Sequence, residues 1–305
     1  MKTWLEKWFS GRPGVEQATL DAIAAQVAQL ETATAASFRT VNKQLRNAER
    51  RAVLQQPHQD YPAEVQERVL AIGRLLKPTE ARDAEMARFG NSNDGGYVQL
   101  DALNGVTSVL SLGISDDVSW DLDIAQRGMT VWQYDHSVEG PPIAHEKFRF
   151  HKLKVAPHSG SGCVSLGEII AVATGPNGHV LLKMDIEGSE WEVLDNTPAG
   201  VLARCSQIVC ELHHFHHLHI DRHYERVKRV LEKLSGIFGV VHVHSNNFSP
   251  IIVLGNVPFF QTLEVTFANR TVFDLRQTQK IFPTALDAPN NPTLADHFLG
   301  RFDFG

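Results

Sequence analysis

The stretch HVLLKMDIEGSEW, residues 179–191, joins a run of branched apolar side chains to an acidic turn and then to a helical stretch. The apolar run ends at Asp185 and has the length of a fully buried strand. Gly188 marks the turn, and a helix is predicted over 189–196. A buried strand that passes through a polar turn into a helix is the repeating unit of a parallel sheet, because parallel strands require a crossover connection.

Similar units occur along the rest of the chain. Three other apolar runs also end in glycine, acidic or histidine residues: VTSVLSL (106–112), MTVWQYD (129–135) and CSQIVCEL (205–212). Helical patterns alternate with them over 118–127, 165–173 and 221–235. The alternation predicts an α/β fold with a doubly wound, Rossmann-like sheet that is mostly parallel. Two later segments, VVHVHSNN (240–247) and TLEVTFANRT (262–271), predict antiparallel C-terminal strands.

The composition excludes several classes of protein. The chain has 305 residues, 35 acidic and 29 basic side chains, and a formal net charge of −6, which argues against a general nucleic-acid partner. Its 3 cysteines contain no C-x-x-C pair, so a disulfide scaffold is not expected. The sequence has no apolar run of about 18 residues, and its opening, MKTWLEKWFS, lacks the long apolar core of a secretory signal. These features predict a cytoplasmic protein.

The N-terminal part has a different amino-acid composition and a different spacing of apolar residues. Residues 14–54 are rich in Ala, Gln, Glu and Arg, and apolar side chains recur three and four positions apart at Leu20, Ile23, Val27 and Leu30. This spacing predicts a long coiled-coil helix through which the chain self-associates. A helix packed on its own domain would show the same stripe. We favour self-association because a helix this long needs a partner for its apolar side.

Two boundaries and a short amphipathic segment complete the organisation. Trp4 and Trp8 would share one side of a short helix, which predicts peripheral contact with the inner membrane surface or docking on a partner. Prolines and a change of composition divide the chain into an amphipathic and coiled-coil part (1–56), a linker with a helix (57–80), the sheet-forming domain (81–275) and a C-terminal tail (276–305).

The strand ends predict a nucleoside-binding crevice, since ligands of open parallel sheets bind beyond the carboxyl ends of the strands. Asp135 follows Gly113 by about 20 residues, the spacing at which an acid accepts hydrogen bonds from ribose hydroxyls. The sequence lacks G-x-G-x-x-G and the P-loop pattern, which disfavours NAD and nucleoside triphosphates. S-adenosyl-L-methionine, which has a ribose and no phosphate, fits this pattern better.

Several motifs resemble one family, the FkbM-like class I methyltransferases, and most closely its methyltransferase-like proteins with D-G-G-Y and K-x-D-I-E-G-S-E-W. The motifs are RFGNSNDGGY (88–97), SLGISDDVSWD (111–121), YDHS (134–137), LKMDIEGSEWEVL (182–194) and CELHHF (210–215). The resemblance covers residues 81–275. It implies a seven-stranded Rossmann-like domain, S-adenosyl-L-methionine as cofactor, and methyl transfer to a hydroxyl of a sugar or glycan-linked acceptor. The first turn departs from the family pattern at Ser111, Ser115 and Asp117.

With this resemblance, each candidate residue acquires an expected role. Gly113 would let the backbone approach the cofactor, Ser115 and Asp116 would lie near its methionine part, and Asp135 would hold the ribose. The Asp94-Gly95-Gly96 stretch has two interpretations, a turn into an edge strand or a loop that covers the cofactor or acceptor, and we favour the loop.

The catalytic candidates are Asp185, Glu187 and His213, which would assist removal of the hydroxyl proton. Alternatively, Asp185, Glu211 and His213 would bind Mg²⁺ or another divalent cation that acidifies the hydroxyl. Structural interpretations also remain, because Asp185 suits a helix N-cap and Glu187 suits the first turn of a helix.

The histidine-rich segment HHFHHLHIDRH (213–223) contributes to an unusually high total of 15 histidines. It allows a zinc site and hence a metal-dependent hydrolase, although it has no companion cysteine or H-E-x-x-H, so most of these histidines are expected in a loop or at the surface. Further on, His242 and His244 either contact the acceptor or pair with Glu264. A third alternative is a non-catalytic methyltransferase-like scaffold for the coiled coil.

Overall fold

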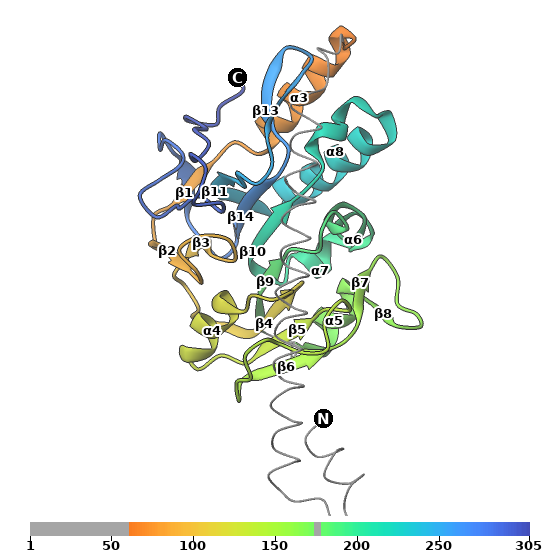
Figure 1. The fold of residues 1–305 in the computed structure, drawn as a ribbon, viewed down its shortest axis with the longest axis vertical. Coiled ribbons are helices and arrows are strands. Elements are labelled where there is room, and N and C mark those ends of the chain that lie inside the picture. The colour runs from red at the N-terminus through yellow and green to blue at the C-terminus, as the bar shows by residue number, and fades with distance from the viewer. Residues whose placement is uncertain (1–60, 174–177) are drawn as a thin grey trace, which may run out of the picture. The chain divides into compact units, whose positions relative to one another are not determined.

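The structure of the protein is a computed structural model that describes residues 61–173 and 178–305 (Figure 1). The predicted coiled-coil helix over 14–54 and the amphipathic segment with Trp4 and Trp8 lie outside the described residues. Residues 57–305 form one compact unit. None of its described helices has the length and apolar character needed to cross a membrane.

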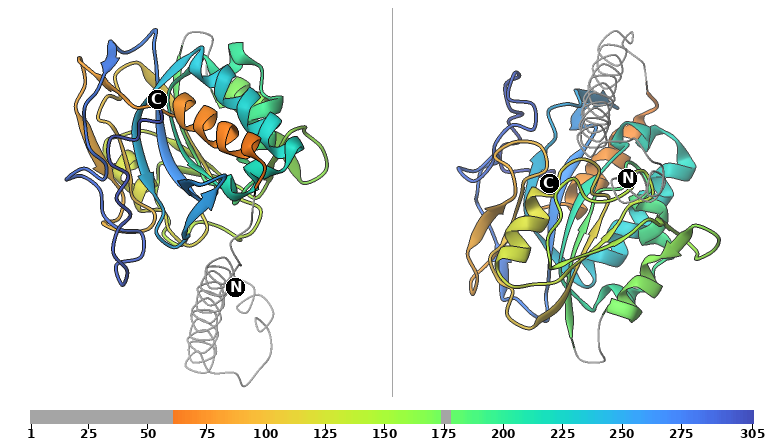
Figure 2. Two further views of the ribbon diagram at one scale, coloured as in Figure 1. Left: turned by 90° about the horizontal axis from the view of Figure 1, so that it is seen from above. Right: turned by 60° about the horizontal axis from the view of Figure 1, so that its bottom comes forward.

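A seven-stranded sheet is the frame of this unit (Figures 1 and 2). Its strands are β4 (Val106–Leu112), β5 (Val131–Tyr134), β6 (Phe148–His151), β9 (His179–Met184), β10 (Cys205–Leu212), β11 (Phe238–Ser245) and β14 (Leu263–Asn269). Their order in the sheet is β11-β14-β10-β9-β4-β5-β6. The chain proceeds from β4 to one edge and then returns to place β9 on the other side of β4. The strand order therefore reverses between β4 and β9, where open α/β sheets bind ligands.

The predicted strand directions are confirmed, with one refinement. β4, β5, β6, β9 and β10 pair in parallel, and β14 is antiparallel to both β10 and β11. Because β14 reverses direction between its two neighbours, β11 runs the same way as the rest of the sheet. Only β14, rather than both late strands, runs against the others.

The central strands are apolar along their whole length because layers cover both of their faces. All eight positions of β10 are buried. α6 (Glu190–Asn196), α8 (Asp221–Ser235) and α3 (Ala63–Leu75) pack together on one face, while α4 (Ser119–Gln126) lies on the other (Figures 1 and 2). The remaining helices are α5 (Leu166–Ala173) and α7 (Ala199–Leu202). Strands buried on both faces lose the alternating pattern of half-exposed strands.

The predicted helix of the linker region is α3, which begins after Pro62. A proline at this position suits a helix start because the first turn does not need its N–H. The side chains of Val65, Val69 and Ile72 are fully buried, and α3 contacts α8. The helix is therefore part of the same core as the sheet.

Smaller elements surround the sheet, and the sequence pattern did not reveal most of them. They form four two-stranded sheets and a 3-10 helix: β1 (Thr79–Ala81) with β15 (Leu275–Gln277), β2 (Met86–Phe89) with β3 (Tyr97–Leu100), β7 (Lys154–Ala156) with β8 (Cys163–Ser165), β12 (Ile251–Leu254) with β13 (Val257–Phe260), and η1 (Phe215–His219). The D-G-G-Y turn connects β2 to β3, as its interpretation as a turn into a strand predicts.

The C-terminal residues 276–305 have little regular structure beyond β15, yet they pack on the compact unit. Phe282 and Phe302 are buried, and so are Asn290 and His297. The ring of Phe304 lies so close to α3 that a Cβ atom at Gly73 would be 2.4 Å from it. This segment therefore contributes to the core.

Candidate functional site

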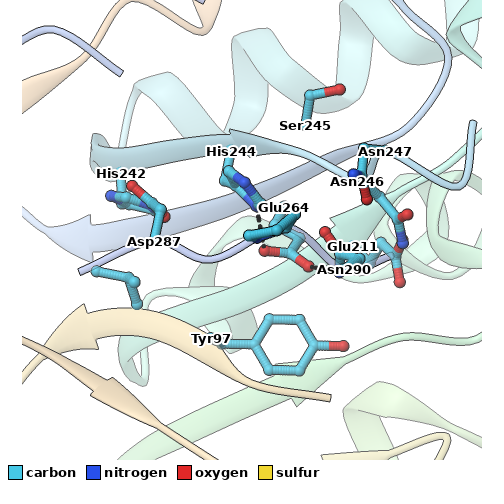
Figure 3. Close-up of polar contacts among 12 residues, drawn as sticks. Tyr97, Glu211, His242, His244, Ser245, Asn246, Asn247, Glu264, Asp287 and Asn290 are labelled. Carbon is cyan, nitrogen blue, oxygen red and sulfur yellow. Dashed lines mark hydrogen bonds and ion pairs between the residues drawn. The ribbon is translucent and has the colours of Figure 1, made fainter. Parts of the chain in front are cut away.

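A row of ionisable side chains crosses four neighbouring strands near their ends. Glu211 of β10 pairs directly with Glu264 of β14, which in turn pairs with His244 of β11. Asp185 extends the row, since it follows Met184, the last residue of β9. Directly paired residues project from the same face of a sheet, and Figure 3 shows Glu211, Glu264 and His244 turned toward one another. The row lies where the predicted crevice requires polar groups.

Asp185 has the most unusual environment in this row. Its Oδ2 accepts a hydrogen bond of 2.9 Å from the Tyr97 hydroxyl, and its Oδ1 is buried. Burial favours the neutral carboxyl, but the positive charges of Lys183 and His213, together with hydrogen bonds with Glu211 and Tyr97, outweigh this effect and lower the pKa of Asp185. The surroundings therefore favour the carboxylate form of Asp185, beside the carboxyl group of Glu211.

Glu211 has the opposite protonation. Its Oε1 accepts a hydrogen bond of 2.6 Å from the amide of Asn246. Burial, and then the negative charge of Asp185, raise the pKa of Glu211 well above its usual range. Two carboxyl groups in such proximity do not both ionise. The pair therefore favours a state with one shared proton, and the opposite pKa shifts favour Glu211 as the group that holds it.

His213 lies among three carboxyl groups. Its Nδ1 is 3.3 Å from Oε1 of Glu190, and its Nε2 is 3.7 Å from Glu187 and 3.9 Å from Glu211. Burial opposes a charge here, but Glu211 and Glu190 prevail and raise the pKa of His213 well above its usual range. The surroundings therefore favour the protonated imidazolium, whereas only the deprotonated form of His213 could act as a base.

Glu190 and Trp191, which follow Gly188 in the D-I-E-G-S-E-W motif and were not predicted as site residues, explain why the loop after β9 keeps its shape. The completely buried Glu190 accepts hydrogen bonds from the N–H groups of Ile186 at 2.9 Å and Gly188 at 3.2 Å. The indole N–H of Trp191 donates to the carbonyl of His213 at 2.7 Å. The motif thus fastens the end of β9 to the end of β10 and supports the catalytic candidates between them.

Gly113 is required by close backbone packing. It has a φ of 78°, and a Cβ atom at this position would lie 1.7 Å from the carbonyl oxygen of Asp185. The ammonium group of the buried Lys183 donates to the Gly113 carbonyl at 2.5 Å and lies 5.5 Å from the centre of the Tyr97 ring. Lys183 and Tyr97, both missed as site residues, join the turn after β4 to Asp185.

Asp135 is held by four hydrogen bonds from the protein. Its Oδ2 accepts from the N–H groups of Ile114 and Ser115, each at 2.9 Å. Its Oδ1 accepts from the N–H of Ser137 at 2.7 Å and from its hydroxyl at 2.6 Å. These contacts fill the acceptor positions of a carboxylate. A ribose would have to replace the bonds from the exposed Ser137, so the expected ribose role stays a prediction.

The remaining cofactor candidates lie near this turn. Ser115 and Asp116 are exposed on it, and Ser115 has a left-handed φ of 43°. A Cβ atom at Gly95 would meet the carboxylate of Asp117 at 2.7 Å, which places the D-G-G-Y loop against the same turn. Asp94 at its tip accepts a hydrogen bond of 3.2 Å from Asn290 of the C-terminal segment. A similar Cβ atom at Gly96 would lie 1.9 Å from the carbonyl oxygen of Asn91, so both glycines have a structural reason.

The far end of the row is closed by the C-terminal segment (Figure 3). His244 contacts Glu264 through Nδ1 at 3.0 Å and Asp296 through Nε2 at 3.1 Å. The hydrogen bonds that the imidazole donates to the carboxylates of Asp296 and Glu264 overcome burial and raise the pKa of His244 to about 10. Asn290 donates to Glu264 at 2.6 Å. His244 thus shows the expected cross-strand pairing, whereas His242 contacts Asp287 at 2.8 Å instead of Glu264.

One set of these residues has the arrangement of a cation site. Within residues 61–173 and 178–305, only Asp185, Glu211 and His213 bring three ligand atoms within 4.8 Å of one another. Two carboxylate oxygens and an imidazole suit a divalent cation. The Asp185 carboxylate would be one of the ligands of this ion. The predicted metal ligands are therefore gathered at one point, whereas Asp135, Ser115 and Asp116 lie at the neighbouring turn.

Comparison with known proteins identifies the central part of the chain. Residues 106–235 match the model of the methyltransferase FkbM domain, which confirms the resemblance inferred from the motifs. The matched region contains all the predicted site residues except the Asp94-Gly95-Gly96 loop. It begins with β4 and ends with α8.

One curated relative and two solved structures are similar to parts of the chain. The probable methyltransferase-like protein 24 of Homo sapiens is 30% identical over 118 residues, which are 34% of this chain and 31% of that protein. This chain thus matches about a third of the length of its relative. Two solved structures of WbdD, one described as a bifunctional kinase-methyltransferase, share 13% and 12% identity with this chain at a TM-score of 0.31. Each covers 55% of this chain. The matched part is 36% of the first WbdD chain and 35% of the second, so the likeness is distant.

Proposed function

We propose that this protein, whose domain match indicates a methyltransferase, is an S-adenosyl-L-methionine-dependent O-methyltransferase that acts on a hydroxyl of a sugar or glycan-linked acceptor. The observation that carries the proposal is the Asp185 carboxyl, whose pKa its surroundings lower, at the strand end where the sheet order reverses. A hydroxyl acceptor requires such a group, because its proton must leave as the new bond forms.

The bound cofactor would supply an electrophilic methyl group. If the acceptor oxygen takes this methyl group and the sulfonium leaves as a neutral thioether, the acceptor hydroxyl must lose its proton, and the carboxylate of Asp185 would accept it. The Tyr97 hydroxyl orients this carboxylate through Oδ2, and the Lys183 and His213 charges favour its ionised form until the proton arrives. Glu187, exposed beside His213, would assist removal of the hydroxyl proton.

A divalent cation is the second element of the proposal. Asp185, Glu211 and His213 would hold Mg²⁺ or a similar ion, which would polarise the acceptor hydroxyl and displace the proton of Glu211 and that of His213. Chelation should then abolish activity, and Mg²⁺ should restore it. Full activity in the presence of a chelator would leave Asp185 alone as the base.

Asp185→Asn tests the base. The substitution keeps the shape of the side chain and removes its ability to take a proton, so methyl transfer should fall by roughly 10²- to 10⁴-fold. The measurement is transfer of labelled methyl groups to glycan extracts. Glu192→Gln, on the outer face of α6 where Glu192 pairs with Arg226, is the matched control and should retain activity. Unreduced transfer by Asp185→Asn would refute the assigned role.

One observation favours the second candidate function, a non-catalytic methyltransferase-like scaffold. Asp135, the expected ribose ligand, already has four hydrogen bonds from the protein. Calorimetric titration with S-adenosyl-L-methionine distinguishes the two functions. Binding supports the enzyme, whereas no heat of binding, with the protein folded, supports the scaffold.

Three further proposals rest on the sequence of the N-terminal part. They are self-association through residues 14–54, peripheral contact with the inner membrane surface through Trp4 and Trp8, and a cytoplasmic location. Sedimentation of the full chain would reveal an oligomer if the first is correct. Loss of vesicle binding in a Trp4→Ala, Trp8→Ala variant would support the second.

A further inference from the structure

A second cluster of titratable side chains lies outside the candidate site. The chain folds back between η1 and the first turn of α8, and this brings the imidazole rings of the histidine-rich segment together. The ring of His217 lies at the centre, 3.9 Å from the ring of His216, 5.6 Å from that of His214, 5.7 Å from that of His223 and 6.4 Å from that of His219, measured between ring centres. These contacts link η1 to α8.

Three rings of this cluster, those of His216, His217 and His223, lie in surroundings that favour the neutral imidazole. Burial, together with the neighbouring imidazoles, lowers the pKa of His216 to about 3 and that of His223 to about 4, and it also lowers the pKa of His217. Neutral imidazoles carry an exposed lone pair on one nitrogen, and this is the form that binds metal ions.

Two ring nitrogens in the cluster lack a hydrogen bond within the described residues. Nδ1 of His216 and Nε2 of His223 are buried and have no hydrogen-bond partner among the described residues. The other ring nitrogen of His223 hydrogen-bonds to the backbone of His214. Such a bond to a carbonyl fixes the proton on Nδ1 and leaves the lone pair on Nε2, an arrangement common in metal-ligating histidines.

The type of ligand atom in the cluster indicates which class of metal ion it would bind. The ligand atoms are imidazole nitrogens, and Arg226 adds a positive charge nearby. Hard cations such as Mg²⁺ require oxygen ligands, whereas imidazoles suit Zn²⁺, Cu²⁺ and Ni²⁺. The cluster therefore differs in kind from the oxygen-rich set around Asp185.

We propose that His216, His217 and His223 form a transition-metal site, with Zn²⁺ as the ion of choice. In the present conformation the three nitrogens do not converge as Asp185, Glu211 and His213 do, so the imidazoles must turn about their side-chain bonds when the ion binds. The bound ion would fasten η1 to α8. This site goes beyond the proposed methyl transfer and does not depend on it.

The experiment is titration of the full chain with Zn²⁺, followed by calorimetry and by the melting temperature. One high-affinity equivalent is expected to bind. At a free Zn²⁺ concentration of about 100 times Kd, the melting temperature should rise by about 5 to 10 °C. His217→Gln and His223→Gln should each weaken binding by about 10-fold or more, while the exposed His158→Gln and the site variant Asp185→Asn should bind Zn²⁺ as the unmodified chain does.

Two results would overturn the proposal. Equal Zn²⁺ binding by the unmodified chain and by the double variant His217→Gln, His223→Gln would show adventitious binding elsewhere. Loss of Zn²⁺ binding in Asp185→Asn alone would assign the ion to the candidate catalytic site. His217 is only partly buried, so its replacement should preserve the fold, and circular dichroism without metal verifies this. Absorption bands of bound Co²⁺ offer a second readout that needs no methyl transfer.

Discussion

Two carboxyl groups side by side acquire different chemistry from their surroundings. The positive charges of Lys183 and His213 lower the pKa of Asp185, while burial and the neighbouring Asp185 raise the pKa of Glu211. Pairs of titratable groups whose pKa values are shifted in opposite directions by their surroundings are characteristic of catalytic sites. The difference separates a group that accepts a proton from one that donates a hydrogen bond.

Glu211→Gln is informative because an amide resembles a protonated carboxyl. We expect the fold to be retained, with a change of about 1 kcal/mol or less in the free energy of unfolding. If Glu211 ligates a cation, stimulation of methyl transfer by Mg²⁺ should disappear in this variant. Activity assays with and without Mg²⁺ measure this, and unchanged stimulation would remove Glu211 from the ligand set.

Gly113→Ala examines the contact between the turn after β4 and the end of β9. The new methyl group would collide with the Asp185 carbonyl, at a φ of 78° that alanine disfavours. We expect a loss of about 2 kcal/mol or more in the free energy of unfolding, measured in urea. Gly200→Ala in α7, where no atom lies within 4 Å, is the control and should be neutral or stabilising. Equal stability of both variants would contradict the contact.

Residues are harder to predict from sequence than the strands that carry them. Asp185, Glu211 and His213 were found because each follows or ends an apolar run. Tyr97 and Lys183 escaped notice, since their partners come from distant parts of the chain. Glu190 stood in a quoted motif, but its buried position beneath the loop is visible only in three dimensions.

Among the elements, the central strands and the edge strand differ in how readily their sequence reveals them. β4, β9 and β10 read as continuous apolar runs, because both of their faces are buried. β6 has the sequence FRFH and was missed, since at the edge only one of its positions is buried. η1 was missed as well, because a helix of five residues is too short to show a period.

A pH-dependent charge on His244 helps to hold the C-terminal segment (276–305) against β11 and β14. The pKa of His244 is about 10 in the folded protein, above its usual value near 6.5. Its stabilising contribution is therefore complete below pH 6.5 and is lost as the pH rises towards 10. At about 1.4 kcal/mol for each tenfold change in proton affinity, the loss is at most about 5 kcal/mol.

His244→Gln should reveal this contribution. The difference in free energy of unfolding between the unmodified chain and the variant should be largest near pH 6 and should shrink by pH 10. Urea denaturation at several pH values measures it, with His158→Gln as the control. A difference that is independent of pH would mean that His244 is neutral in the folded protein.

At the scale of the whole molecule, the sequence predicted the layered α/β architecture but treated residues 276–305 as a tail. No hydrophobic period marks this segment, because side chains hold it individually. Asp287 meets His242, Asp296 meets His244, and the amide of Asn247 donates to backbone carbonyls of the segment, including that of Asn291 at 3.1 Å. Such contacts follow no repeat, so a search for helical or strand periods does not detect them.

The position of β14 also dictates a sequence of events during protein synthesis. β11 is separated from β10 by β14, so β11 cannot hydrogen-bond to the sheet until residues 263–269 have been made. During synthesis, β11 and its histidines therefore have no strand partner in the sheet until about 20 further residues have left the ribosome. Completion of the sheet therefore waits for β14, whose pairing with the distant β10 is a long-range contact of the kind that slows folding.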